Sequence, residues 1–386
     1  MKSYGPILVG SSLSGFFGYL ALLLINSGSD TQLFIDFAIA WGVYSSVLFI
    51  LQGESIRSVE KILSVSGKGA RSSASVKWVI LLFVLLLSTL AISGFNWFDG
   101  LAPIIIFFLF GLGTLAGFLH RKIAGSMLAL GQEVSVGLAA AVEGFVRLTL
   151  VLALADLGHL VFIAIPASSV ASLTVLTAIQ RRYRANPAHD MKVSWSLDWL
   201  LALGFLFMSV VANGSLAWIS LLWGSGDKQQ LSNLAVSIGI DRAVILMLLL
   251  ALQGLIFRQM LLANSGRTFW SNTLLLIVLI FFTSVSVSFF TAALRGYLDP
   301  ISVEFFTLHI GNSLFGLLVI RSLRFAKKAD SKAFLITWIS TSLVFVFVSA
   351  VSISTLGPEL SFGLAQLTSA LSGLILATRV LKETEA

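Results

Sequence analysis

The chain has 386 residues, of which 57% are hydrophobic and only 11% are charged, with a formal net charge of +7. Soluble domains carry about 25% charged residues, so this composition excludes a water-soluble globular protein, a disordered chain and a fibrous repeat. There is no cysteine, which excludes disulfides, cysteine-ligated zinc and iron–sulfur clusters. The four histidines show no metal-ligand spacing, so no metal site is predicted.

Apolar runs long enough to cross a bilayer recur along the whole chain, since a spanning helix needs about 20 such residues. Twelve runs qualify: residues 6–26, 33–52, 77–96, 102–120, 133–156, 158–180, 198–222, 230–257, 268–293, 301–324, 332–355 and 358–381. The first run has one lysine before it but no small-residue cleavage site after it, so it is interpreted as a helix and not as a signal peptide. The sequence therefore predicts an all-α integral membrane protein with twelve transmembrane helices.

The basic residues predict the orientation, because lysine and arginine accumulate in the cytoplasmic loops of membrane proteins. Of the 25 basic residues, all but four lie at the termini or in loops that follow even-numbered spans. The exceptions are Arg147, Lys228, Arg242 and Arg295. We therefore expect both termini to be cytoplasmic. The positive net charge is then a signal of membrane orientation and does not indicate a nucleic-acid partner.

The two halves of the chain resemble each other. Near the end of the second and the eighth span the sequence reads Leu-Gln-Gly and then arginine, at residues 51–57 and 252–258. Upstream, Asp30 and Gln32 match Asp227 and Gln229. Because each copy has an even number of spans, the copies have the same orientation in the membrane. We expect two parallel six-helix halves, residues 1–185 and 186–386, around a central cavity.

The fifth span carries three ionisable residues, although each such group costs about 2.5–3.5 kcal/mol at mid-bilayer unless it faces protein or water. Glu133, Glu143 and Arg147 lie within one arc of the predicted helix. Two interpretations are open for Glu143 and Arg147. They are either a self-neutralising pair one turn apart or part of a cavity wall. In the second case Arg147 meets an anionic group of the substrate, and Glu143 holds the substrate or relays protons.

Five further positions are candidates for the same cavity. Asp241 and Arg242 lie about halfway along the eighth span, and adjacent helical residues point 100° apart, so at least one of them faces a cavity or another helix. Gln253 lies on nearly the same helix face as Arg242. Asp36 and His309 are secondary candidates, since Asp36 lies near the outer end of its span and a hydrogen-bonded interior role also suits His309.

The pattern of twelve spans in two halves with very short outer loops resembles the bacterial polysaccharide flippases. This is the O-antigen-type branch of the multidrug/oligosaccharidyl-lipid/polysaccharide exporter superfamily. The local similarity is strongest at Glu143-Gly144-Phe145-Val146-Arg147, with Arg121 and Lys122 upstream. The resemblance implies that the protein flips a polyprenyl-pyrophosphate-linked oligosaccharide across the bacterial cytoplasmic membrane by alternating access. It also implies that Arg147 and Arg242 attract the pyrophosphate or acidic sugars.

From this resemblance we expect a monomeric multi-pass protein of the inner membrane. Its partners are the lipid-linked glycan and membrane lipids, with no nucleic acid. No cofactor is expected, and the coupling ion is H⁺ or Na⁺.

Two other functions remain alternatives. An ion-coupled small-molecule or drug antiporter of the same superfamily has the same span pattern. A membrane glycan polymerase or glycosyltransferase needs a sizeable outer loop or domain, and the outer loops here are short. The major facilitator class is disfavoured because residues 53–76 lack its Gly-x-x-x-Asp-Arg signature. We therefore expect a transporter and not an enzyme.

Overall fold

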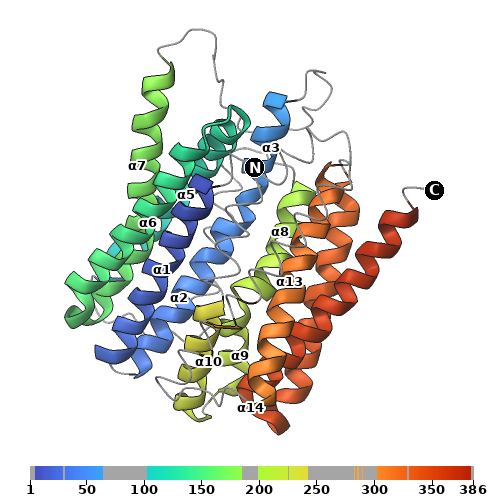
Figure 1. Ribbon diagram of the computed structural model, residues 1–386. Coiled ribbons are helices and arrows are strands. Elements are labelled where there is room, and N and C mark those ends of the chain that lie inside the picture. Colours follow the sequence, from blue (N-terminus) through green and yellow to red (C-terminus); the bar gives the residue numbers. More distant parts are fainter. Residues whose placement is uncertain are drawn as a thin grey trace.

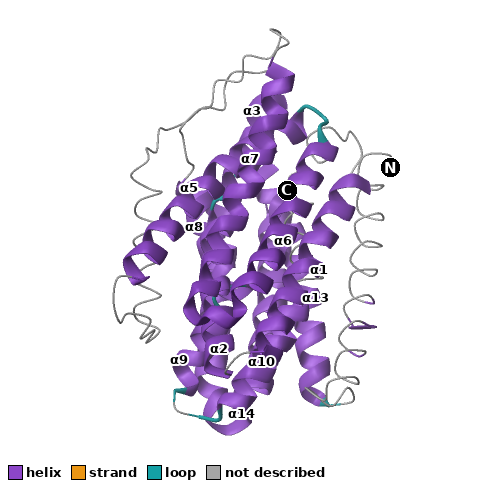
Figure 2. Cartoon of the chain, turned by 90° about the vertical axis from the view of Figure 1, so that its left-hand side faces the viewer, coloured by secondary structure: helices purple, strands orange, loops and turns teal. Residues whose placement is uncertain are grey.

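The computed structural model describes residues 5–28, 31–63, 102–184, 199–224, 226–241, 302–327 and 330–383, with isolated positions between 282 and 289. These residues form long helices joined by short turns, with no strand in the described ranges (Figures 1 and 2). The helices are α1 (Gly5–Gly28), α2 (Thr31–Ile50), α3 (Gln52–Leu63), α5 (Ala102–Ala129), α6 (Glu133–Leu154), η1 (Ala155–Ile163), α7 (Ala164–Arg184), α8 (Trp199–Ala212), α9 (Ser215–Trp223), α10 (Lys228–Asp241), α13 (Val303–Lys327) and α14 (Ser331–Glu383). The predicted all-helical fold is confirmed.

Five helical stretches in the described ranges are long and apolar enough to cross a membrane. Two of them, Glu133–Arg181 and Ser331–Leu381, are 49 and 51 residues long, so each contains two predicted spans. A sixth span is present if α8 and α9 count as one. The predicted spans 77–96 and 268–293 and the end of the span 230–257 lie outside the described residues, apart from the isolated positions.

The predicted turns between consecutive spans coincide with glycines in the left-handed region. Gly158 has φ +60° and Gly357 has φ +75°, a conformation that glycine adopts at little cost. Pro358 follows Gly357 directly and cannot continue the preceding helix without losing a hydrogen bond. Each glycine separates the fifth from the sixth predicted span of its half.

Helix packing follows the same order in both halves of the chain. In the first half, the first span packs on the fifth: α1 lies against α6, with Gly144 at the backbone of Ser14. In the second half, α8 packs against the first part of α14, where Gly204 meets Phe334. Figure 1 shows the helices of the first half on one side of the bundle and those of the second half on the other.

The fourth and sixth spans also pair in each half. Gly113 of α5 lies against Pro166 of α7, and Gly311 of α13 lies against Gln366 in the second part of α14. Repeated pairing of this kind is what two parallel copies of one six-helix unit require. The predicted boundary between the halves, at residues 185 and 186, lies outside the described residues.

The span predicted at 198–222 differs from expectation, because the structure divides it into α8 and α9, bent by 54°. At the break, the carbonyl of Ser209 accepts the backbone N–H groups of both Asn213 and Gly214 at 2.8 and 2.9 Å. Ser342 of α14 donates to the carbonyl of Phe207 at 2.6 Å. Partners outside the helix therefore satisfy backbone groups around the bend, as non-helical backbone in a membrane protein requires.

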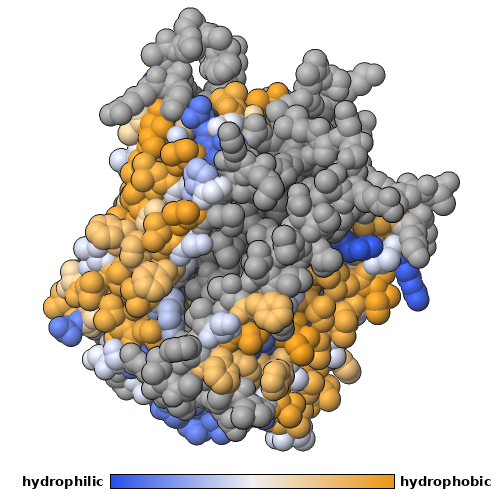
Figure 3. All heavy atoms as spheres, viewed as in Figure 1, coloured by the Kyte–Doolittle hydropathy of each residue, from blue (hydrophilic) through white to orange (hydrophobic). Residues whose placement is uncertain are grey.

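The described surface is that of a membrane protein. Apolar side chains cover the sides of the bundle and hydrophilic ones gather towards its two ends (Figure 3). Large apolar side chains point outwards, such as Phe347 at 69% exposure. Helix α1 begins and α14 ends at the same end of the bundle, which we call the terminal end (Figure 1). That this end faces the cytoplasm stays a prediction.

Candidate functional site

Helix α6 brings two of its charged side chains into contact. Arg147 Nη2 donates to Glu143 Oε1 at 2.8 Å, across one helical turn. The Arg147 side chain is 4% exposed and that of Glu143 is 16% exposed. The structure therefore places the predicted pair inside the protein, where charges interact far more strongly than in water.

Residues from three other helices complete the surroundings of Arg147. On α7, the Ser168 hydroxyl accepts a hydrogen bond from Nη2 at 3.2 Å and itself donates to the carbonyl of Ile165. On α2, the Trp41 ring lies under the guanidinium, 4.7 Å from its central carbon. On α1, Gly18 leaves room for both, since a Cβ there would lie 2.9 Å from the Trp41 ring. Arg147 is thus held by groups that lie far apart in the sequence.

Arg147 retains hydrogen-bonding capacity beyond these contacts. A guanidinium has five N–H donors. Among the described residues, its buried Nε and Nη1 atoms have no hydrogen-bond partner. An unsatisfied buried donor costs about 1–3 kcal/mol, and more if it is charged. The site can therefore gain free energy by presenting Nε and Nη1 to an acceptor, and an anion satisfies both the charge and the donors.

A second guanidinium acts on the same carboxylate. Arg121 of α5 interacts electrostatically with Glu143, and so does the buried Tyr44 of α2. The hydroxyl of Tyr44 lies beside Gly113, 2.6 Å from where a Cβ would be. The sequence places Arg121 in the loop after the fourth span, where it contributes to the orientation signal, and ahead of the similar segment at residues 143–147. The loop position is wrong, because α5 continues to Ala129 and keeps Arg121 within the helix.

Sequence reasoning also missed the roles of Trp41 and Ser168. Trp41 fits a residue that fills a gap between helices, and nothing in its spacing indicates a guanidinium partner. Ser168 is one of many hydroxyl residues that bond neighbouring helices in membrane proteins. Only the lone arginine in the span 133–156 was a usable signal, because a buried arginine needs acceptors and an aromatic or carboxylate neighbour.

The other candidates in the described ranges lie elsewhere. Glu133 is buried at the first residue of α6, on the same side as Arg147. Asp36 is half-buried on α2 and accepts a hydrogen bond from Gln32 at 2.8 Å. His309 is buried in α13, with its ring packed on Phe305 at 4.2 Å between centroids.

The second-half candidates fall at or beyond the edge of the described residues. Asp241 is the last described residue of α10, and its side chain is not described. Arg242 and Gln253 lie outside the described residues. Their proposed place in the cavity stays a prediction. Within the described ranges, no group of three or more His, Asp or Glu side chains is arranged to hold a metal ion.

The contact between Trp41 and Arg147 leads to a first prediction. Replacing Trp41 by leucine is expected to lower the free energy of unfolding by about 2 kcal/mol more than replacing it by phenylalanine. The reason is that a desolvated cation–π contact is worth about 2 kcal/mol, and phenylalanine keeps an aromatic face. Thermal unfolding of both purified variants in detergent measures the difference. Equal melting temperatures would contradict the contribution assigned to the ring.

Comparison with known proteins identifies the fold. The sequence matches no protein-family model and no curated protein. The structure is similar to that of a multidrug resistance MATE family transporter of the MOP superfamily in an outward-facing conformation. In that comparison the TM-score is 0.70 at 14% identity, with 99% of this chain and 95% of the other covered.

Two further solved structures of MATE proteins are also similar to this structure. A MATE protein in the straight conformation has a TM-score of 0.65 at 13% identity, covering 100% of this chain and 96% of the other. The Vibrio cholerae MATE transporter VcmN in the bent form has a TM-score of 0.60 at 12% identity, covering 99% of both chains. At such low identity these similarities establish the fold alone. The chain has the fold of MATE transporters over its whole length.

Proposed function

We propose that this protein is a transporter that moves a polyprenyl-pyrophosphate-linked oligosaccharide across the bacterial cytoplasmic membrane by alternating access. The MATE-type fold supports a transporter, and the resemblance of the sequence to polysaccharide flippases supports the lipid-linked substrate. The observation that carries the proposal is the buried Arg147, whose Nε and Nη1 have no partner among the described residues. A pyrophosphate supplies several charged acceptor oxygens of the kind that a guanidinium binds best.

The balance of charge in the first half favours an anionic substrate over a cationic one. Glu143 is in contact with one guanidinium and interacts with a second, that of Arg121. Neither α1, α5 nor α7 contains an acidic residue, and neither does the predicted span 77–96. A cationic substrate would add a third positive charge beside these two guanidiniums, whereas phosphate oxygens would be acceptors for them.

The remaining features of the proposal extend the sequence predictions. The two halves, residues 1–185 and 186–386, enclose a central cavity, to which Asp241 and Arg242 contribute from the second half. The protein is a monomer with both termini in the cytoplasm. Glu143 is a suitable carrier if transport is coupled to H⁺, since release from Arg147 leaves it free to bind a proton.

A drug antiporter is the second candidate, and one observation favours it. A structurally similar protein is a multidrug resistance MATE family transporter. In an antiporter of this kind, Glu143 would be the residue that exchanges a proton for the substrate. A third possibility, a glycan polymerase or glycosyltransferase, gains no support from the MATE-type fold.

The two leading functions are separable by complementation of a deletion strain. We expect deletion to abolish the surface glycan and to leave drug tolerance unchanged. Arg147→Gln should reduce export at least about tenfold, because charged hydrogen bonds contribute about 1.5–3 kcal/mol. Arg379→Gln is the matched control, since Arg379 is exposed near the end of α14. Normal surface glycan with lowered drug tolerance in the deletion strain would instead establish the antiporter.

A further inference from the structure

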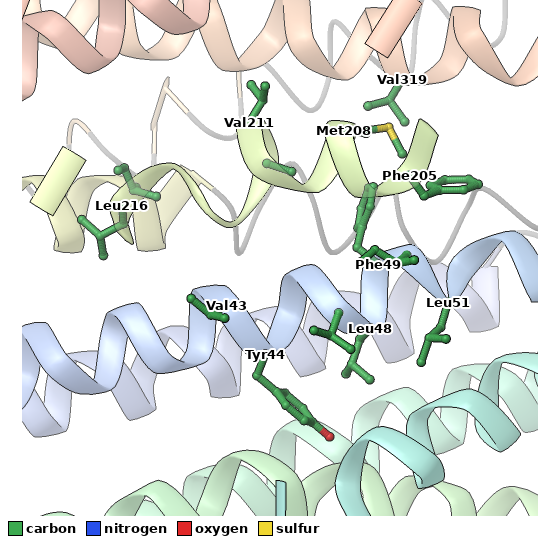
Figure 4. Packing of buried hydrophobic residues seen from close by; sticks show 14 of the residues in the cluster. Val43, Tyr44, Leu48, Phe49, Leu51, Phe205, Met208, Val211, Leu216 and Val319 are labelled. Atoms are coloured by element: carbon green, nitrogen blue, oxygen red, sulfur yellow. The ribbon is translucent and has the colours of Figure 1, made fainter. Parts of the chain in front are cut away.

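Helix α2 is the element at which the two halves of the chain meet, and it presents different residues to each. Tyr44 points towards α5, where its ring lies 5.4 Å from that of Phe110 (Figure 4). Phe49 points the opposite way, towards α8, and its ring lies 5.9 Å from that of Phe205 (Figure 4). One face of α2 therefore belongs to the interior of the first half, and the other is part of the junction between halves.

Near the terminal end this junction is apolar and closely packed. A Cβ on Gly53 would lie 3.4 Å from the Phe205 ring and 3.6 Å from Leu201. Phe49, Leu201 and Phe205 are each at most 2% exposed. On its other side Phe205 packs against Phe334 of α14 at 5.0 Å, which fixes it to the second half. We call Phe49, Gly53, Leu201 and Phe205 the terminal seam.

Further from the terminal end the junction between the halves is still apolar in part but also contains hydrogen bonds. One turn before Phe49, Ser46 donates to the carbonyl of Ser209 at 3.4 Å. Ser209 is the residue whose carbonyl also accepts the N–H groups at the bend between α8 and α9. Between α1 and α10, Ser232 donates to Asn26 at 3.3 Å. The terminal seam itself lies between these hydrogen bonds and the terminal end.

We propose that the terminal seam is a gate, closed in this structure, that separates when the protein opens towards the terminal end. This inference depends on alternating access, which is part of the proposed function. The seam suits the role because the side chains that meet in it come from two separate halves and are apolar. Such contacts exclude water when closed and break without leaving an unpaired buried polar group. Rocking of one half against the other needs a junction with this property.

The absence of cysteine from the chain allows a direct test of opening. A single Gly53→Cys places its Cβ in the seam, at ordinary van der Waals distance from Leu201 and Phe205. Its alkylation by a membrane-impermeant maleimide in membrane vesicles measures how often the seam opens, and needs no substrate. Adding Phe49→Ala is expected to raise the alkylation rate about tenfold, because the closed seam loses the buried ring that packs on Phe205.

Phe37→Ala is the matched control for this measurement. Phe37 is on the same helix and is equally buried, but its ring packs on Trp41 and Phe162, both in the first half. Phe37→Ala should therefore leave the alkylation rate of Gly53→Cys unchanged. Equal alkylation rates of Gly53→Cys with and without Phe49→Ala would contradict the gate. The gate and the substrate are tested separately. If alkylation responds as expected while deletion of the gene leaves glycan export intact, the proposed substrate is contradicted and the gate is supported.

A disulfide tests whether opening is required for transport. In the pair Gly53→Cys and Leu201→Cys, oxidation should stop export and reduction should restore it. The control pair, Ser172→Cys and Ala139→Cys, joins α7 to α6 within the first half, where Ser172 Oγ lies 3.0 Å from the Ala139 carbonyl oxygen. Oxidation of the control pair should leave export unchanged. Undiminished export by the fully oxidised seam pair would overturn the proposal.

Discussion

Replacing Glu143 by leucine is expected to destabilise the protein by about 3–5 kcal/mol, since removing one partner of a buried ion pair leaves the other charge uncompensated. The Arg147 side chain is only 4% exposed and is surrounded by residues of α1, α2, α6 and α7, so loss of Glu143 leaves its charge poorly solvated in this conformation. The melting temperature in detergent should fall accordingly. The melting temperature of Glu143→Gln should fall less, because glutamine keeps an acceptor for Arg147.

The double variant Glu143→Leu with Arg147→Met separates a structural pair from a functional one. Replacing a buried ion pair by apolar residues of similar volume is often neutral or stabilising, so the melting temperature should return close to that of the parent. Export should nevertheless stay at least about tenfold below that of the parent, because the Arg147 guanidinium that binds the substrate anion is missing. A double variant that is both stable and fully active would reduce the pair to a structural role and contradict the proposed function.

The positions of the described spans were predictable from the sequence because hydropathy and length act locally. The position at which α5 ends was less predictable. His120, Arg121 and Lys122 end the apolar run that begins at residue 102, yet the helix continues to Ala129 and buries His120 and Lys122. Burial of these polar residues depends on neighbouring helices, and a hydropathy pattern contains no information about them.

The bend between α8 and α9 shows the same limit. The sequence from 198 to 222 contains no proline, and Asn213-Gly214 at the break is a turn signal that does not by itself specify a bend within a span. The bend depends on Ser46 of α2 and Ser342 of α14, which bond carbonyls near the break from 163 and 135 residues away. Contacts so distant in the sequence leave no local pattern.

At the candidate site, helical spacing was enough to predict the contact between Glu143 and Arg147. The partners from other helices were not predictable. Trp41 and Ser168 reach Arg147 only because α2 and α7 pack beside α6. Which of several tryptophans and serines would do so depends on helix rotation, and uniformly apolar helices do not specify their rotation from composition alone.

The packing of α6 on α1 leads to the prediction with the widest consequences, that a single methyl group at Gly10 disables the protein. A Cβ on Gly10 would overlap the backbone carbonyl of Gly137, and neither backbone can move aside without separating the two helices. Overpacking of this kind costs about 1–3 kcal/mol and occasionally more. Separation would also displace α6, and with it Arg147, from Ser168 and Trp41.

Gly10→Ala should therefore lower both the melting temperature and export, and Gly5→Ala should change neither. The two glycines lie on the same helix, but nothing lies within 4 Å of a Cβ at Gly5, the first residue of α1. The comparison thus tests the contact between α1 and α6 at Gly10. Melting temperatures within about 2 °C of each other would contradict it, because a loss of 1 kcal/mol shifts the midpoint by about 2–4 °C even in larger domains. If Gly10→Ala keeps its stability but loses export, the close approach of the helices serves to position Arg147 more than to hold the fold.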